Sequence, residues 1–150
     1  MSSLGKLKSS KLPKKGPLKM SRDILNMWYL AMSSDDFNRL NRSDYEPARS
    51  QLRTDLGYSP SGVLCDLYGR TWGEDRWVKT NNGWEWDGIW LGKCPDDVIK
   101  WAFSLENYGL SAARTSTTVA ELREVLFAFD CWADTQDEFP GYNHLVRVFG

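Results

Sequence analysis

Residues 76–86 contain the stretch that decides the fold, and they read Arg-Trp-Val-Lys-Thr-Asn-Asn-Gly-Trp-Glu-Trp. Aromatic and polar residues alternate on both sides of Asn81-Asn82-Gly83, a pattern typical of two antiparallel strands joined by a tight turn. The second strand is expected to continue to Trp90, and a third strand from Gly69 to Gly73 is an open alternative. The sequence therefore predicts a Trp-rich β-hairpin or small antiparallel sheet.

The segments on either side of this hairpin show the helical spacing of apolar residues. Ser21 is an expected N-cap, and Ser59-Pro60 combines a cap with a first-turn proline. For residues 62–68 a buried strand is the competing interpretation, because a short apolar run fits either element. The predicted helices are one that begins at Ser21, one from Asp44 to Leu56, one from Ser59 to Gly69, one that begins at Pro95, one that begins at Thr118, and one from about Pro140 to Val148.

Two of these helices have further start signals. Asp96 and Asp97 follow Pro95 and face the positive end of the helix dipole. Thr118 and Glu121 have the spacing of a capping box. The resulting fold class is α+β, with mostly short helices packed on the Trp-rich hairpin and an extended basic arm at the N-terminus.

The charge of the chain is unevenly distributed. Seven of the 19 basic residues lie within residues 1–22, which contain no acid, whereas residues 23–150 hold all 20 acidic residues. A segment so rich in lysine cannot bury enough apolar surface to fold alone. We therefore expect residues 1–20 to form an extended arm and residues 21–150 to form a single compact domain. The arm lysines are Lys6, Lys8, Lys11, Lys14, Lys15 and Lys19.

The basic arm has three interpretations. It could dock on an acidic protein surface, including that of a neighbouring copy, it could neutralise nucleic-acid phosphates with strong salt dependence, or it could only confer solubility. Its proline and leucine content favours docking along a protein groove. Protein is therefore the expected partner, with nucleic acid through residues 1–22 as the alternative.

The tryptophans are unusually dense in and before the hairpin. A two-stranded hairpin has one face to bury, so some of these rings are expected at a surface, where tryptophan is typical of protein interfaces and of base stacking. A Trp-rich core under the hairpin is an equally weighted alternative. The neighbouring acids Glu85 and Asp87 repel phosphate, which favours protein over nucleic acid. The candidate contact residues are Trp72, Trp77, Trp84, Trp86 and Trp90.

The cysteines and the N-terminus limit where the protein works. Cys65, Cys94 and Cys131 are odd in number and form no Cys-x-x-Cys pair, which argues against a disulfide framework and a cysteine-based zinc site. The N-terminus lacks the apolar stretch of a secretory signal, and no run approaches the ~18 apolar residues of a membrane span. We expect reduced thiols in a cytosolic setting, without a signal peptide or a membrane partner.

Catalytic and metal-binding groups are few. With one histidine, His144, the chain excludes His-pair metal sites, and a Cys131/His144 nucleophile pair is a minor alternative to two structural residues. Asp96 and Asp97 could act as an acid–base pair, but their position at a helix start explains them. A cation site and a solvated acidic loop are the two alternatives for Asp134, Asp137, Glu138 and His144. We expect no enzyme activity, no cofactor and no metal.

Three segments form a recognisable set: Gly62-Val63-Leu64-Cys65-Asp66-Leu67, the Pro95-x-x-Val98-x-x-Trp101-Ala102 segment, and Phe139 followed by Leu145-Val146. Together they resemble a family of small uncharacterised proteins common in bacteriophages and prophages. This similarity spans about residues 28–149, although Pro60-Ser61 stands where the family has Cys-Leu and Cys94 where it has leucine. The resemblance implies a phage-type origin, a location in the virion or the host cytoplasm, and a compact helix-plus-hairpin fold, but no activity.

The function expected from these observations is that of a non-catalytic interaction protein. The favoured hypothesis is an accessory structural component of a virion or large assembly, which uses the basic arm and the Trp-rich acidic body as contact surfaces. The alternative is a non-virion phage factor that modulates a host protein or binds nucleic acid through its arm.

Overall fold

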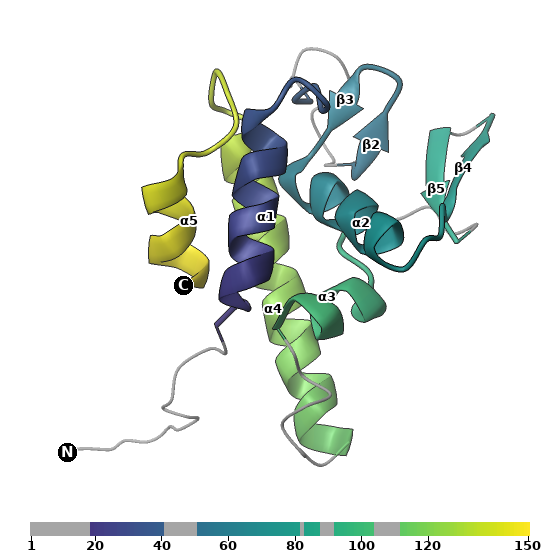
Figure 1. Cartoon of the computed structure of the whole chain (residues 1–150). Coiled ribbons are helices and arrows are strands. Elements are labelled where there is room, and N and C mark those ends of the chain that lie inside the picture. The colour runs from purple at the N-terminus through teal and green to yellow at the C-terminus, as the bar shows by residue number, and fades with distance from the viewer. Residues whose placement is uncertain (1–18, 41–50, 82, 88–91, 104–111) are drawn as a thin grey trace.

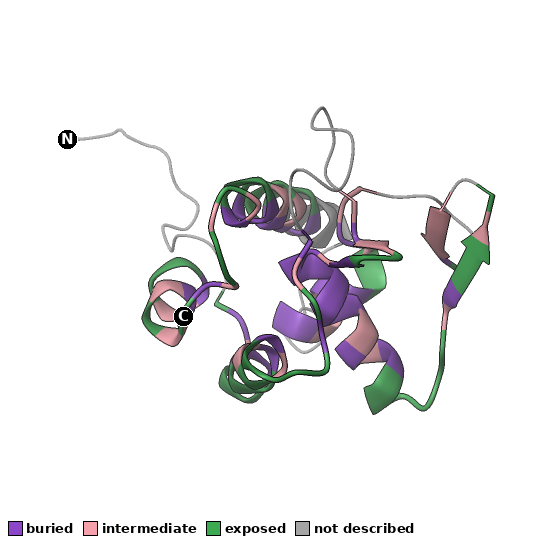
Figure 2. Cartoon of the chain, turned by 90° about the horizontal axis from the view of Figure 1, so that it is seen from above, coloured by how far each residue is buried: buried purple, intermediate pink, exposed green. Residues whose placement is uncertain are grey.

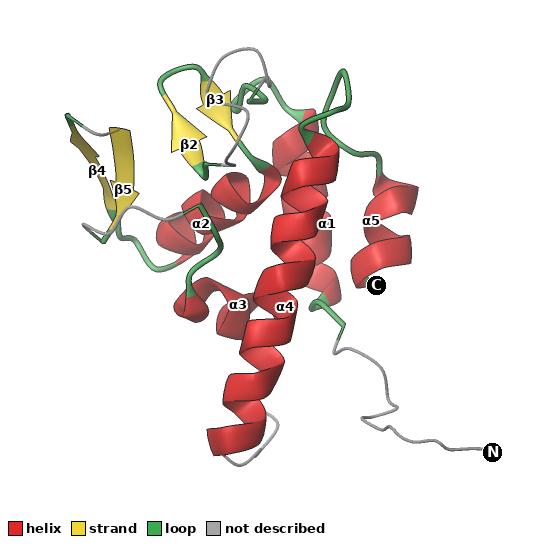
Figure 3. Ribbon diagram, turned by 180° about the vertical axis from the view of Figure 1, so that it is seen from behind, coloured by secondary structure: helices red, strands yellow, loops and turns green. Residues whose placement is uncertain are grey.

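The computed structural model describes residues 19–40, 51–81, 83–87, 92–103 and 112–150, with residues 112–118 as backbone alone. It confirms the α+β class (Figures 1 and 3). The arm residues 1–18 and Trp90 lie outside the described residues. The helices of the described part are α1 (Arg22–Ser33), α2 (Pro60–Thr71), α3 (Asp96–Phe103), α4 (Ala112–Ala133) and α5 (Tyr142–Phe149), and its strands are β2 (Arg53–Thr54), β3 (Gly57–Tyr58), β4 (Trp77–Thr80) and β5 (Gly83–Trp86).

Helix α2 lies at the centre of the fold. It contacts α1, α3, α4 and β3, and it separates the other helices from the two hairpins (Figure 1). Val63, Leu64 and Cys65 are completely buried, and most of this central helix carries the buried colour in Figure 2. Gly62 packs so closely on the backbone of Leu52 that a Cβ at this position would collide with the Leu52 carbonyl. The glycine therefore permits α2 to lie directly on the segment before β2.

The start of α2 is buried, and its backbone groups are hydrogen-bonded by side chains from its own N-cap, from α4 and from α1. The Ser59 hydroxyl accepts from the Gly62 N–H at 3.1 Å, as the predicted cap requires. Asp130 Oδ1 of α4 accepts from the Ser61 N–H at 3.0 Å, and Trp28 Nε1 of α1 donates to the Pro60 carbonyl at 2.8 Å. These bonds tie α1, α2 and α4 together inside the core.

The predicted hairpin is confirmed. Trp77 pairs with Trp86 and Thr80 pairs with Gly83 in an antiparallel register, while Asn82 lies outside the described residues. Gly83 has φ of 119°, a conformation that favours glycine. The predicted helices that begin near Ser21 and Pro95 and the helix that ends the chain are also confirmed, as α1, α3 and α5.

Other predicted elements were wrong. Of the predicted helix from Asp44 to Leu56, residues 44–50 lie outside the described part, and the remainder contains β2 and the turn that leads to β3. Gly57 follows the turn of that hairpin, and its Cα lies too close to the backbone of Asn38 and Arg39 to leave room for a Cβ. This second hairpin depends on a contact with a distant segment, which local spacing does not reveal.

The region around α2 and the start of α4 also differ from the expectation. Residues 62–68 are helical, and α2 continues through Gly69 to Thr71, so both the competing strand and the third strand from Gly69 to Gly73 were wrong. Gly69 lies inside the helix, and a Cβ at this position would collide with the Glu74 carbonyl. Helix α4 already begins at Ala112, so the predicted start at Thr118 was wrong as well. A capping-box sequence does not mark the start of a helix when the residues before it are already helical.

No helix among the described residues combines the length and the apolar character that a membrane span requires.

Asp130 makes the stability of the fold depend on pH. Complete burial, opposed in part by the bonds from Ser61, raises the pKa of this carboxyl to about 7. The folded state binds this proton more tightly than the unfolded state does, so the protonated carboxyl group stabilises the fold. This contribution to the free energy of unfolding is complete below about pH 4 and is lost as the pH rises through 7. We expect urea unfolding to show a stability loss of up to roughly 4 kcal/mol between pH 4 and pH 8 from this group.

The Asp130→Asn variant tests the assignment. An amide keeps the acceptor for the Ser61 N–H but does not titrate, so the fall in stability with pH should largely disappear. His144, whose pKa burial lowers, acts in the opposite sense and is unchanged in the variant. A wild-type protein with the same pH dependence as the Asn variant would contradict the assignment.

Candidate partner-binding surface

The structure distributes the predicted contact tryptophans between core and surface. Trp77 and Trp86 are buried and pack edge to face, with ring centroids 5.0 Å apart. Trp84 is half-buried, and its Nε1 donates to Asp55 at 2.9 Å. Trp72 is 59% exposed, the largest exposed fraction among the described tryptophans. Of this predicted set, Trp72 is therefore the best candidate for contact with a partner.

The second hairpin explains why the hairpin tryptophans are more covered than one buried face would allow. Strand β2 packs against β5. The Arg53 guanidinium of β2 lies 3.6 Å from the ring centroid of Trp84, and within 5.4 Å of those of Trp77 and Tyr58. These cation–π contacts cover one side of the rings.

Trp72 belongs to a row of aromatic rings that leads from the surface into the core. Trp72 caps the C-terminus of α2, and its ring contacts Tyr68 edge to face at 6.3 Å between centroids. Tyr68 in turn contacts Trp101 of α3 at 5.4 Å and the buried Trp86 at 6.4 Å. Because Tyr68 and Trp101 are both half-buried, the exposed indole sits on a fixed aromatic support.

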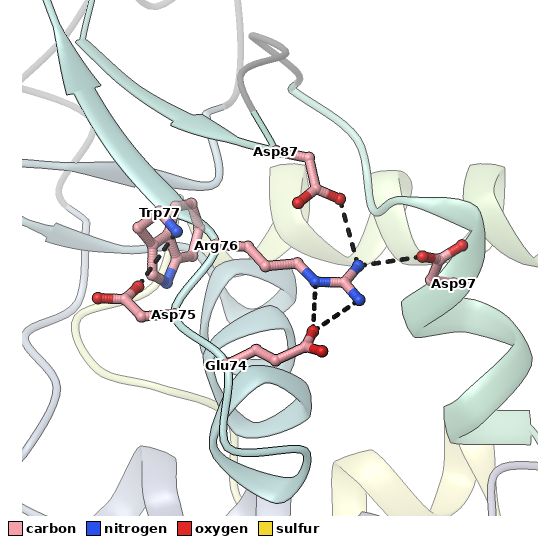
Figure 4. A network of polar contacts seen from close by, with 6 residues as sticks. All are labelled: Glu74, Asp75, Arg76, Trp77, Asp87 and Asp97. Carbon is pink, nitrogen blue, oxygen red and sulfur yellow. Dashed lines mark hydrogen bonds and ion pairs between the residues drawn. The ribbon is translucent and has the colours of Figure 1, made fainter.

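Arg76 lies beside this row and holds three carboxylates (Figure 4). Its Nε donates to Glu74 at 2.8 Å, and its Nη1 donates to Asp87 at 3.2 Å and to Asp97 at 3.1 Å. The hydrogen bonds to Glu74 and Asp97 raise the pKa of the guanidinium above its ordinary value. The guanidinium carbon also lies 5.2 Å from the ring centroid of Tyr68.

The Arg76 cluster is therefore acidic overall, because three carboxylates surround one cation. Each carboxylate side chain is about half exposed, between 49% and 55%. We call the aromatic row and this cluster together the Trp72 surface. Its members are Tyr68, Trp72, Glu74, Arg76, Asp87, Asp97 and Trp101.

The candidate catalytic and metal-binding groups have other contacts. Asp96 pairs with Arg123, and Asp97 pairs with Arg76. The His144 ring stacks on Trp132 with centroids 4.1 Å apart, and Arg147 contacts its Nδ1 at 2.5 Å. Burial, and then the charge of Arg147, lower the pKa of His144. Within the described residues, no three histidine, cysteine or acidic side chains are arranged to hold a metal ion.

A polar cleft of about 330 Å³ lies between α2 and the hairpins. Its charged side chains are largely engaged within the fold. Asp66 pairs with Arg70 at 2.7 Å and accepts from Trp77 Nε1 at 3.1 Å, and Asp75 accepts from the Trp77 N–H at 3.1 Å. The contact between Asp66 of α2 and Trp77 of β4 therefore holds the hairpin on α2.

Of the arm lysines, Lys6, Lys8, Lys11, Lys14 and Lys15 lie outside the described residues, and Lys19 is exposed. The chain is anchored directly after Lys19. The Met20 N–H donates to the Phe149 carbonyl, and the Ser21 N–H donates to the Ala102 carbonyl, both at 2.9 Å. The arm therefore leaves the domain beside the C-terminal end of α3.

The cysteines show one contact that sequence spacing did not indicate. Cys65 in α2 and Cys94 before α3 are both buried, and their thiols are hydrogen-bonded to each other. Burial, and then the neighbouring Cys94 thiol, raise the pKa of Cys65 well above its ordinary value. Cys131 is exposed, and none of the three cysteines is in a disulfide.

This arrangement predicts one fast-reacting thiol. Because Cys131 is exposed and burial shields Cys65 and Cys94 from a reagent, Cys131 should react with a thiol reagent in the native protein, and the two buried cysteines should react only on unfolding. Ellman's reagent gives the count directly. The Cys131→Ser variant should lose the fast phase, and a native protein with several fast thiols would contradict the structure.

A scan against protein-family models and searches of curated proteins and of solved structures find no significant match to this chain. Its function must therefore be inferred from its own surfaces. Among the surfaces of the described residues, the Trp72 surface combines the most exposed indole with a fixed aromatic support and a group of charged side chains.

Proposed function

We propose that this protein is a non-catalytic interaction protein that binds a partner protein through the Trp72 surface. The exposure of Trp72 on a rigid aromatic row is the observation that carries the proposal. Following the resemblance of its sequence motifs, we further propose that it is an accessory structural component of a phage-type particle or assembly.

The composition of the surface supports a protein partner. Tryptophan, tyrosine and arginine are the residues most enriched among those that dominate binding energy at protein interfaces. Trp72 is held by Tyr68, which is packed on the core through Trp86, so little conformational entropy is lost when a partner covers the indole. The partially exposed charges of the Arg76 cluster would form a polar rim around it.

The charge of the surface disfavours nucleic acid at this site. Glu74, Asp87 and Asp97 together exceed the single charge of Arg76, and a net negative surface repels phosphate. A basic or neutral polypeptide fits this charge better. Nucleic acid remains the alternative partner for the basic arm, not for the Trp72 surface.

The contacts of the chemical groups support a non-catalytic role. Asp96 and Asp97 are used to join α3 to α4 and to the loop after α2, respectively. The buried Asp130 carboxyl group accepts a hydrogen bond at the start of α2. In each of these cases the side chain has a structural partner that accounts for its position.

A partner-binding experiment tests the role of Trp72. Benzoyl-phenylalanine placed at position 72 of the full chain should cross-link one partner protein in cells that contain it, and the same probe at Leu30 should not. Leu30 is a matched control because it is 64% exposed on α1. For the partner so identified, Trp72→Ala should weaken binding by about 30-fold or more, as expected for a loss of roughly 2 kcal/mol.

The Leu30→Ala variant should bind that partner like the wild type, which calorimetry can measure. Equal affinities of Trp72→Ala and wild type would refute the surface. Circular dichroism of both variants shows whether the fold is retained.

The assembly proposal has a separate test. Mass spectrometry of purified phage particles from a host that produces the protein should detect it at a fixed ratio to a major particle protein. Its absence from purified particles would reject the structural role and leave a non-virion factor.

A further inference from the structure

We propose that residues 1–18 dock on the Trp72 surface of their own molecule and cover it until a partner displaces them. The docking itself is argued from the anchor point, length and chemistry of this segment. Its regulatory consequence rests on the proposed function of the surface.

The arm leaves the domain next to the Trp72 surface. Ser21 is hydrogen-bonded to Ala102, and the preceding residue in α3 is Trp101, a member of the surface. From Trp101 the aromatic row continues to Tyr68 and Trp72. A chain that turns along α3 from its C-terminal end toward Asp97 therefore passes the aromatic row and reaches the Arg76 cluster.

The arm is long enough for this path. Helix α3 contains 8 residues, which corresponds to about 12 Å of helix axis. An extended chain spans up to ~3.3 Å per residue, so roughly a third of residues 1–18 would cover the length of α3 and reach Trp72. The rest of the arm can make further contacts along the cluster.

The chemistry of the two sides is complementary. Residues 1–18 hold five lysines, no acid, and the leucines Leu4, Leu7, Leu12 and Leu18. The surface offers three half-exposed carboxylates around one guanidinium, and an indole beside them. Lysine can place its aliphatic stem on the rings and its ammonium on the carboxylates, and leucine can cover the indole.

The prolines of the arm suit such docking. Proline disfavours a helix and favours an extended conformation in the residue before it, and the arm sequence contains Pro13 and Pro17. An extended segment loses less conformational freedom on a surface than a flexible one.

Attachment favours the arm of the same molecule over that of a second copy. A short tether gives the bound segment an effective concentration in the millimolar range. A second copy reaches such a concentration only at far higher protein levels. Docking within one molecule should therefore be independent of dilution.

Cross-linking within the full chain tests the docking. Benzoyl-phenylalanine at position 72, irradiated in dilute purified protein, should give a monomeric product in which residue 72 is joined to peptides of residues 1–18. The same probe at position 30 measures chance encounters of an undocked arm, because Leu30 is also exposed and lies within reach of the arm from its anchor at Met20. We expect a severalfold higher yield at position 72.

A charge variant checks the cause. Replacement of Lys6, Lys8, Lys11, Lys14 and Lys15 by glutamine should lower the yield at position 72 to that at position 30. An increase of salt from about 0.05 M to 0.5 M should act in the same direction, because it screens exposed charges. Equal yields at the two positions in the wild type, or products that are dimers, would overturn the inference.

The outcomes separate the two proposals. An arm cross-link without any partner cross-link at position 72 would support docking and count against the proposed function. A partner cross-link without an arm cross-link would do the reverse. Where both cross-links form, the glutamine variant should bind the partner more tightly than the wild type does, because its arm no longer competes for the Trp72 surface.

Discussion

Helix α2 begins inside the protein, and the rest of the structure depends on how its buried polar start is hydrogen-bonded. The first N–H groups of a helix have no partner within the helix, and burying them without one is costly. Ser59 and Asp130 satisfy two of these groups, from the helix's own N-cap and from α4. Because Asp130 comes from α4, the capping of α2 also fixes the packing of the longest helix.

The same helix connects the core to the candidate binding surface. Its buried first half carries Val63 and Leu64, and its second half carries Tyr68 and ends at the exposed Trp72. Arg76 follows directly and joins the loop after α2 to the end of β5 and to the start of α3. The orientation of Trp72 is therefore set by the core, and this rigidity is what makes the indole a suitable anchor for a partner.

Much of the fold could be predicted from local patterns, and the two main errors have separate causes. Periodic apolar residues revealed α1, α3 and α5, and the alternating tryptophans revealed the β4–β5 hairpin. The β2–β3 hairpin was missed because its strands are two residues each, and it depends on the close approach of Gly57 to residues 38 and 39. The start of α4 was placed too late because Thr118 and Glu121, which have the spacing of a capping box, lie inside a continuous helix.

The sequence by itself determined the α+β class, the main helices and hairpin, and the separation of a basic N-terminal segment from an acidic body, because these follow from spacing and charge along the chain. Tertiary structure alone decided which tryptophans are exposed. Trp77 and Trp86 are buried and Trp72 is not, since Arg53 and Tyr58 of the second hairpin lie against Trp77, and Tyr68 of α2 lies against Trp86. It also decided that Cys65 meets Cys94 and that Arg76 gathers Asp87 and Asp97. These contacts join segments distant in sequence, and no local pattern encodes which distant side chain will occupy the space beside a given residue.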